Sequence, residues 1–150
     1  MISFTVFVGY FVRLWMSDSI EQSNGPVSRA LAKGHCVLDL PSSAHNVQYA
    51  SIVGGVQYTE AFVRFEAPAP DCLAYASGLL AKSSPSKPSL PAPTLQPTSH
   101  PARPGNDSKL HVEWFDIENI AEGVTAGEHT SEPQIWIDTK RGIFYYRATD

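Results

Sequence analysis

The sequence predicts an α+β fold, in which an antiparallel sheet of four to six strands has one main helix packed on one face. Three observations lead to this prediction. Several stretches after residue 36 alternate apolar and polar residues, as half-buried strands do. Two pairs of these stretches are separated by short turn sequences, Gly54-Gly55 and 139–142, which is typical of hairpins. One segment, which begins at Pro70, instead has the apolar spacing of an amphipathic helix.

Composition excludes several classes of protein. The 150 residues are 43% hydrophobic and 17% charged, with 12 prolines, 10 glycines and 2 cysteines. This does not fit collagen, a coiled coil, a disulfide-dense scaffold or a fully disordered chain. The net charge is −4, and the sequence has no basic cluster of the kind that binds polyanions. Nucleic acid is therefore not an expected partner.

Residues 1–35 are predicted to precede the domain proper. An apolar run over 2–12 is followed by Arg13 and has no positive charge before it, so it is too short to span a membrane and incomplete as a secretory signal. Three interpretations remain open: the apolar part of an export signal that begins upstream, a degenerate signal or anchor, or an element of the fold. Residues 17–35 are expected to be a polar tether with a short helix over 26–33.

Residues 36–150 are predicted to form a single domain, which opens with strands. Alternation predicts a strand over 36–40 and a hairpin of strands over 46–53 and 56–66. In the predicted strand over 56–66, the apolar alternation at the start of the strand is out of step with the alternation at its end. A bulge near Thr59-Glu60 would reconcile them.

The helix that begins at Pro70 is expected to cover this sheet. Proline suits the first helical position, and Asp71 lies in the first turn, where the helix dipole favours an anion. The predicted buried stripe contains Cys72, Leu73, Ala76, Leu79 and Leu80.

A proline-rich linker over 83–106 is predicted to interrupt the domain, because it holds seven of the twelve prolines and few apolar anchors. The chain then continues with a strand over 110–115 and a short helix or turn over 116–123, capped by Asp116. It ends in a hairpin of strands over 134–138 and 143–147, with Gly142 in the left-handed region.

The two cysteines are each predicted to point inward, Cys36 from a strand and Cys72 from the first helical turn. A disulfide between them would stabilise so small a core by about 2–4 kcal/mol if the chain is exported. Two buried, apolar thiols are the alternative.

One place in the sequence brings an imidazole close to carboxylates. His111 and Glu113 would share one face of the strand over 110–115, with Asp116 nearby. A solvated strand face is the alternative interpretation. The five histidines have no metal-ligand spacing, and neither a phosphate-binding glycine loop nor a G-x-S-x-G motif is present. No metal, cofactor or catalytic residue is therefore predicted.

The C-terminal hairpin is rich in aromatic residues. If Asp138 pairs with Ile143, then Trp136 and Tyr145 share one face of the hairpin. The opposite face then carries Ile135, Ile137, Phe144 and Tyr146. With Trp114, the first two rings would form a binding patch on the sheet; filling of the core is the alternative.

Several strings of the sequence resemble small bacterial proteins of one domain that are exported or lipid-anchored in the cell envelope and have no assigned activity. The resemblance covers 36–82 and 108–150. The strings that carry it are 40–50, Val63-Arg64-Phe65-Glu66-Ala67-Pro68, Asp71-Cys72-Leu73, Trp114-Phe115-Asp116, 133–138 and 142–150. The resemblance implies an envelope setting and carries over no catalytic residue.

Taken together, these observations favour a non-catalytic α+β domain, exported or tethered at the envelope, that binds a protein or a surface ligand. Contact with a membrane is expected only through the N-terminus. Two alternatives remain: a small hydrolase-like enzyme that uses His111, Glu113 and Asp116, and a cytosolic regulatory or interaction module.

Overall fold

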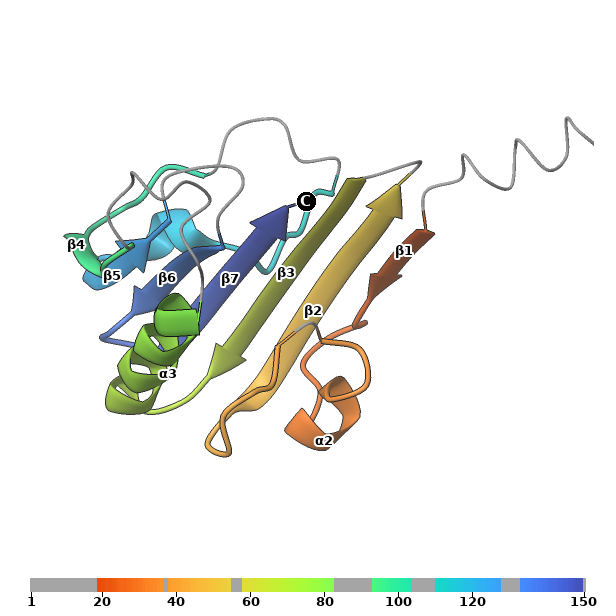
Figure 1. Cartoon of the computed structure of the whole chain (residues 1–150), viewed down its shortest axis with the longest axis horizontal. Coiled ribbons are helices and arrows are strands. Elements are labelled where there is room, and N and C mark those ends of the chain that lie inside the picture. The colour runs from red at the N-terminus through yellow and green to blue at the C-terminus, as the bar shows by residue number, and fades with distance from the viewer. Residues whose placement is uncertain are drawn as a thin grey trace, which may run out of the picture.

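The computed structural model describes residues 19–36, 38–54, 58–82, 93–103, 110–127 and 133–149. In this part of the chain, seven strands form one antiparallel sheet in the order β1-β2-β3-β7-β6-β5-β4 (Figure 1). The strands are β1 (Ser19–Gln22), β2 (His45–Gly54), β3 (Tyr58–Glu66), β4 (Gln96–Thr98), β5 (Gly123–Ala126), β6 (Gln134–Asp138) and β7 (Ile143–Thr149). The last strand of the chain therefore lies near the centre of the sheet, beside β3.

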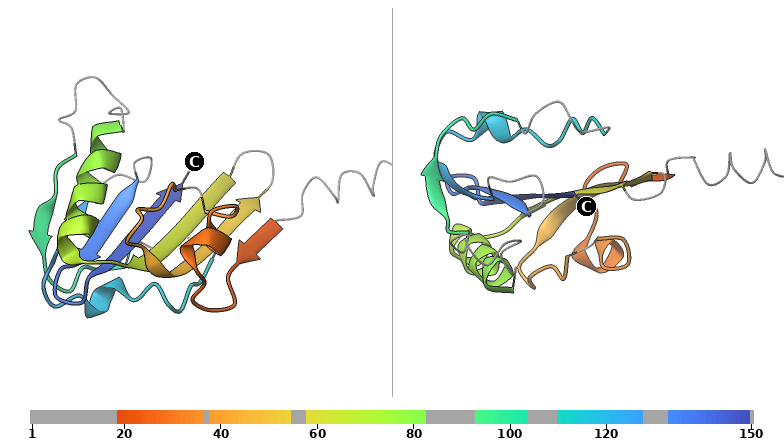
Figure 2. Two further views of the ribbon diagram at one scale, coloured as in Figure 1. Left: turned by 90° about the horizontal axis from the view of Figure 1, so that it is seen from below. Right: turned by 45° about the horizontal axis from the view of Figure 1, so that its top comes forward.

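The sheet lies between two layers (Figure 2). One face is covered by α3 (Ala69–Lys82) and by the four-residue helix α2 (Arg29–Ala32). Residues 110–120, which we call the crossing segment, cover the other face and include the 3₁₀ turn η1 (Ile117–Asn119). An antiparallel sheet with one long helix agrees with the predicted α+β class.

Each face has its own hydrophobic cluster, because side chains alternate along every strand. On the helix face, Phe65 and Phe144 stack with ring centroids 4.6 Å apart, at the junction of β3 and β7. The helix supplies Cys72, Ala76 and Leu80 to this cluster, as predicted, with Leu73 and Leu79 partly buried against it. On the opposite face, the buried residues of the sheet and the crossing segment are Ala50, Ile52, Phe62, Leu110, Val112, Phe115, Ile117, Ile120, Trp136, Ile143 and Tyr145.

Both predicted hairpins are confirmed. β2 and β3 pair as far as Gly54 and Tyr58, and Gly55 of the predicted Gly54-Gly55 turn lies outside the described residues. β6 and β7 pair with Asp138 opposite Ile143, so the predicted division of side chains between the two faces is also confirmed. Gly142 has a φ of 68°, and a Cβ there would lie 2.4 Å from the carbonyl oxygen of Ala67. Only glycine fits this turn without displacement of the neighbouring backbone.

The predicted count of four to six strands is wrong, and three strands lie outside the predicted ones: the short edge strands β1 and β4, and the inner strand β5, which pairs with β6. β1 lies in the segment that we expected to be a tether, and β4 lies in the expected proline-rich linker. Both form by backbone pairing, with β2 and β5 respectively, and their side chains are mostly exposed. Edge strands of this kind tolerate a proline, here Pro97, and carry no apolar alternation that a sequence pattern would reveal.

Two predicted strands are not strands in the structure. Residues 36–40 and 110–115 do alternate, and Leu38, Leu40, Leu110 and Val112 are buried. However, neither segment pairs with the sheet among the described residues. Each lies over a face of the sheet and contributes side chains to the cluster there. The alternation therefore predicted correctly which side chains are buried. It did not predict correctly that the backbone of these segments pairs with a strand.

Two finer predictions are also wrong. The register is continuous through Thr59 and Glu60, and the irregularity lies instead between His45 and Gln48 on β2. Glu60 pairs in register with Ile52, and its buried carboxylate accepts a hydrogen bond of 2.8 Å from Arg147 Nε. Asp116 occupies the position before η1, but its side chain does not cap the turn.

Candidate binding site

An open cavity of about 620 Å³ lies beside the crossing segment, near the β1 edge of the sheet. Three parts of the chain enclose it: the end of β1 with the turn that follows, the side chain of Gln48 on β2, and the start of the crossing segment. The lining residues are Gln22, Ser23, Asn24, Gly25, Gln48, His111, Val112, Glu113 and Trp114.

Most of this lining is polar, and much of it has no partner within the protein. Among the described residues, the side chains of Gln22, Asn24, His111 and Glu113 make no hydrogen bond or ion pair, and all four are exposed. Gln48 is different, because its Oε1 accepts a hydrogen bond of 3.3 Å from Arg64 Nη1. Four polar groups thus face the cavity with their hydrogen-bonding capacity unused.

Gln48 connects the cavity to a charged network on the same face of the sheet. Besides Gln48, Arg64 binds Glu66 through Nη2, with an N–O distance of 2.9 Å. Asn46 Nδ2 donates to the other oxygen of Glu66, also at 2.9 Å. The hydrogen bond from Asn46 and the charge and hydrogen bond of Arg64 lower the pKa of Glu66. Arg64 is therefore held in place by acceptors of the protein itself.

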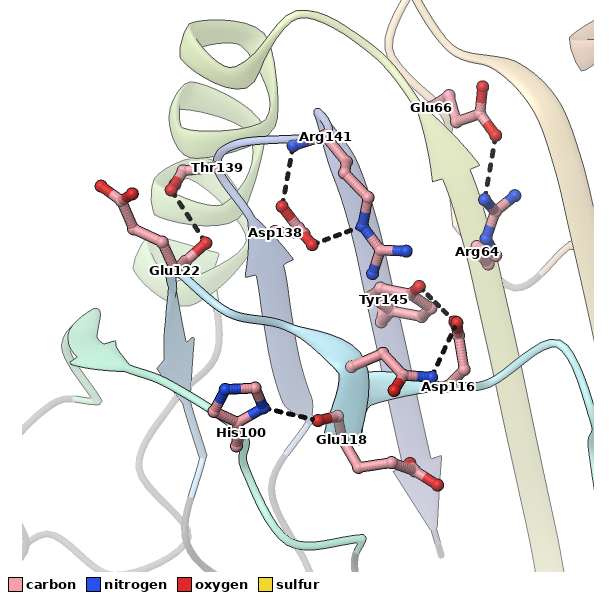
Figure 3. A network of polar contacts seen from close by, with 11 residues as sticks. Arg64, Glu66, His100, Asp116, Glu118, Glu122, Asp138, Thr139, Arg141 and Tyr145 are labelled. Atoms are coloured by element: carbon pink, nitrogen blue, oxygen red, sulfur yellow. Dashed lines mark hydrogen bonds and ion pairs between the residues drawn. The ribbon is translucent and has the colours of Figure 1, made fainter.

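The crossing segment is attached to the sheet through a phenol (Figure 3). Tyr145 OH on β7 donates to Asp116 Oδ1 over 2.6 Å. The guanidinium of Arg64 lies 6.0 Å from the centre of the Tyr145 ring. Burial, and then the hydrogen bond to the Asp116 carboxylate, raise the pKa of Tyr145 to about 12. Tyr145 is therefore a neutral donor that fixes the crossing segment above the sheet.

The residues of the predicted polar cluster are only partly brought together. His111 and Glu113 both line the cavity. Asp116 does not join them, because its carboxylate accepts from Tyr145 and from Asn119 Nδ2. Within the described residues, His111 makes no hydrogen bond with either carboxylate.

Only one of the three residues of the predicted aromatic patch lies at the cavity. Trp136 and Tyr145 are 5% and 0% exposed, so they belong to the core beneath the crossing segment rather than to an exposed patch. Their burial follows from the crossing segment, whose Phe115 packs edge-on against both rings at centroid distances of 5.7 and 5.5 Å. Trp114 is partly exposed and lines the cavity.

Both cysteines are free thiols in the structure, Cys36 half-buried and Cys72 fully buried. Burial raises the pKa of each thiol to about 11, so neither is an activated nucleophile at neutral pH. Cys72 Sγ donates to the carbonyl oxygen of Ala67 at 3.6 Å. A disulfide between the two residues stays a prediction.

Other parts of the site had no signal in the sequence. Gln22 and Asn24 lie in the segment that we expected to be a tether, and Gln48 and Arg64 are polar positions of strands. Among the described residues, no group of three or more His, Cys, Asp or Glu side chains is placed to hold a metal ion. The described helices include none that is long and apolar enough to cross a membrane.

No family model, curated protein or solved structure shows significant similarity to this chain.

Proposed function

We propose that this protein is a non-catalytic binding domain, exported or tethered at the cell envelope, that holds its ligand in the cavity beside Trp114. The observation that carries the proposal is the set of exposed polar side chains that line this cavity without a partner among the described residues. Polar side chains that have no partner within the protein can exchange hydrogen bonds with water for hydrogen bonds with a ligand.

A further feature supports binding over catalysis. Among the described residues, the imidazole of His111 makes no hydrogen bond with a carboxylate, and Asp116 is held by Tyr145. A general base normally needs such an orienting partner within hydrogen-bond distance. The envelope setting is supported by the resemblance of the sequence to exported bacterial proteins and by the apolar N-terminal run.

The test uses the full chain and washed envelope fractions of the cells that produce it. We expect the wild-type protein to cosediment with the envelope fraction, and expect Gln22→Ala and Trp114→Ala to weaken this binding. Gln96→Ala is the matched control, because Gln96 is exposed on the opposite edge strand, β4. Absence of binding, or equal binding of all variants, would contradict the proposal. Recovery of the native protein only from the soluble fraction would remove the envelope setting.

A hydrolase-like enzyme is the second candidate, and one observation favours it: His111 and Glu113 line the same cavity. Hydrolysis of p-nitrophenyl acetate and p-nitrophenyl phosphate tests it. An enzyme of this kind loses turnover in His111→Ala and Glu113→Gln but keeps it in Glu122→Gln, which changes an exposed carboxylate just before β5. Turnover that survives His111→Ala would end this alternative.

A further inference from the structure

The chemistry of the cavity narrows the class of ligand. Its side chains include three carboxamides, those of Gln22, Asn24 and Gln48. A carboxamide both donates and accepts hydrogen bonds in one plane. Neighbouring hydroxyl groups of a sugar ring also both donate and accept. A sugar therefore matches several carboxamides better than a ligand that has only donors or only acceptors does.

The charge of the lining argues against an anionic ligand. Glu113 is the one formally charged side chain among the lining residues, and no lysine or arginine is among them. Arg64 lies behind Gln48, but its guanidinium is bound to Gln48 and Glu66. A phosphate or carboxylate in the cavity would therefore meet a negative charge and no unengaged cation.

The apolar part of the lining consists mainly of one aromatic residue. Trp114 is partly exposed at the cavity, whereas Val112 beside it is buried. A lipid chain or an apolar peptide would need a larger apolar wall. The C–H face of a pyranose ring has the size of one indole, and its hydroxyl groups point outward to polar neighbours. The volume of about 620 Å³ lies within the range of small-molecule sites, about 300–1,000 Å³.

We infer that the cavity formed by Gln22, Asn24, Gln48, His111, Glu113 and Trp114 binds a neutral saccharide, with a sugar ring against Trp114 and its hydroxyl groups on the carboxamides and Glu113. This inference rests on the proposed function, because it names the ligand class of the same cavity.

The experiment titrates the full chain with cellobiose, maltose and N,N′-diacetylchitobiose by isothermal titration calorimetry. Tryptophan fluorescence provides a second readout, and glucose against glucose 6-phosphate tests the charge. We expect at least one neutral disaccharide to bind. Glu113→Gln and Gln22→Ala should each weaken binding about tenfold, the effect of one lost hydrogen bond to a charged or well-placed group. Gln96→Ala and Glu122→Gln should leave binding unchanged. A phosphate on the sugar should weaken binding.

A conservative variant of Trp114 separates the role of its indole ring in binding from any effect on folding. Trp114→Phe keeps an aromatic ring beside Phe115, with which Trp114 makes an edge contact at 6.2 Å. We expect this variant to keep weakened saccharide binding and to lose most of the fluorescence change. An unchanged fluorescence response in Trp114→Phe would overturn the placement of the sugar.

The remaining outcomes separate the two proposals. If none of the disaccharides binds or competes at about 10 mM, a concentration that detects millimolar affinity, while envelope binding still depends on Gln22 and Trp114, the saccharide inference is overturned and the binding function stands. If a disaccharide binds equally to wild type and to the cavity variants, the site is wrong. If neither saccharides nor envelope fractions bind, both proposals fail.

Discussion

Tyr145 donates a hydrogen bond of 2.6 Å to Asp116, a residue 29 positions earlier in the chain. This contact joins the central strand β7 to the crossing segment, the start of which forms one wall of the cavity. Asp116, which accepts this hydrogen bond, does not cap η1 with its side chain. This hydrogen bond thus ties the crossing segment to the sheet, beside the apolar contacts that the segment makes on the same face.

Removal of this hydroxyl group should destabilise the protein. We expect Tyr145→Phe to lower the free energy of unfolding by about 1–3 kcal/mol, because the Asp116 carboxylate loses a charge-assisted hydrogen bond. Tyr75→Phe is the matched control, since the buried Tyr75 hydroxyl has no hydrogen-bond partner among the described residues. That substitution should be neutral or stabilising. Urea denaturation measures both, and equal effects of the two variants would contradict this account.

Breaking the buried ion pair between Glu60 and Arg147 should lower the free energy of unfolding far more than breaking an exposed ion pair. The side chains of the buried pair are 0% and 6% exposed, and Glu60→Gln should cost about 3–5 kcal/mol because it leaves a buried guanidinium without its counter-charge. Glu118→Gln, which breaks the exposed pair with Arg103, should cost less than about 1 kcal/mol.

The double variant Glu60→Leu with Arg147→Met should recover most of that loss, because two apolar residues need no counter-charge. A double variant as unstable as Glu60→Gln alone would show that the pair stabilises the fold for another reason. Thermal unfolding at one fixed pH compares the variants.

Two glycines should respond in opposite ways to alanine. Gly142→Ala forces a Cβ into the left-handed region and against the Ala67 backbone, so we expect a loss of more than about 2 kcal/mol. Gly78→Ala lies in the exposed interior of α3, where an added Cβ meets nothing within 4 Å. It should stabilise the protein by about 0.5–1 kcal/mol. Loss of stability in Gly78→Ala would contradict its open position in the helix, and unchanged stability in Gly142→Ala would contradict the assigned turn.

The pKa of Glu66 gives the protein a predictable response to acid. Asn46 and Arg64 hold this pKa below its ordinary value of 4.5. The unfolded chain therefore takes up the proton at a higher pH than the folded chain does. Stability from this contact is complete above about pH 4.5 and is lost as the pH falls through the lower, folded pKa. Glu66→Gln should be less stable than wild type at neutral pH and should lose less stability on acidification, whereas Glu122→Gln should follow the wild-type curve.

The cysteines should react slowly in the folded protein. Because burial raises both pKa values to about 11, few thiolates are present near pH 8. We expect iodoacetamide to modify Cys36 before Cys72, and both at the rate of a free thiol once the chain is unfolded. Intact mass spectrometry follows the reaction. A requirement for reductant in the unfolded chain would identify the predicted disulfide, and rapid modification of folded Cys72 would contradict its burial.

The sequence by itself determined the elements whose signal is local. Gly142 specifies where the chain reverses between β6 and β7, and the spacing from Pro70 specifies α3, because turns and amphipathic helices depend on residues a few positions apart. Alternation also identified which side chains are buried, including those at 38, 40, 110 and 112. It did so because alternation reflects contact with a core, whatever the backbone is bonded to.

Only the tertiary structure decided which of the alternating segments join the sheet. It also decided that two polar segments join it. β1 and β4 are held by backbone hydrogen bonds at the edges, and such bonds require no particular side chain. The burial of Glu60 depended on Arg147, 87 residues away. The cavity likewise combines residues 22–25, 48 and 111–114. These features arise from contacts between distant parts of the chain, so no local pattern in the sequence encodes them.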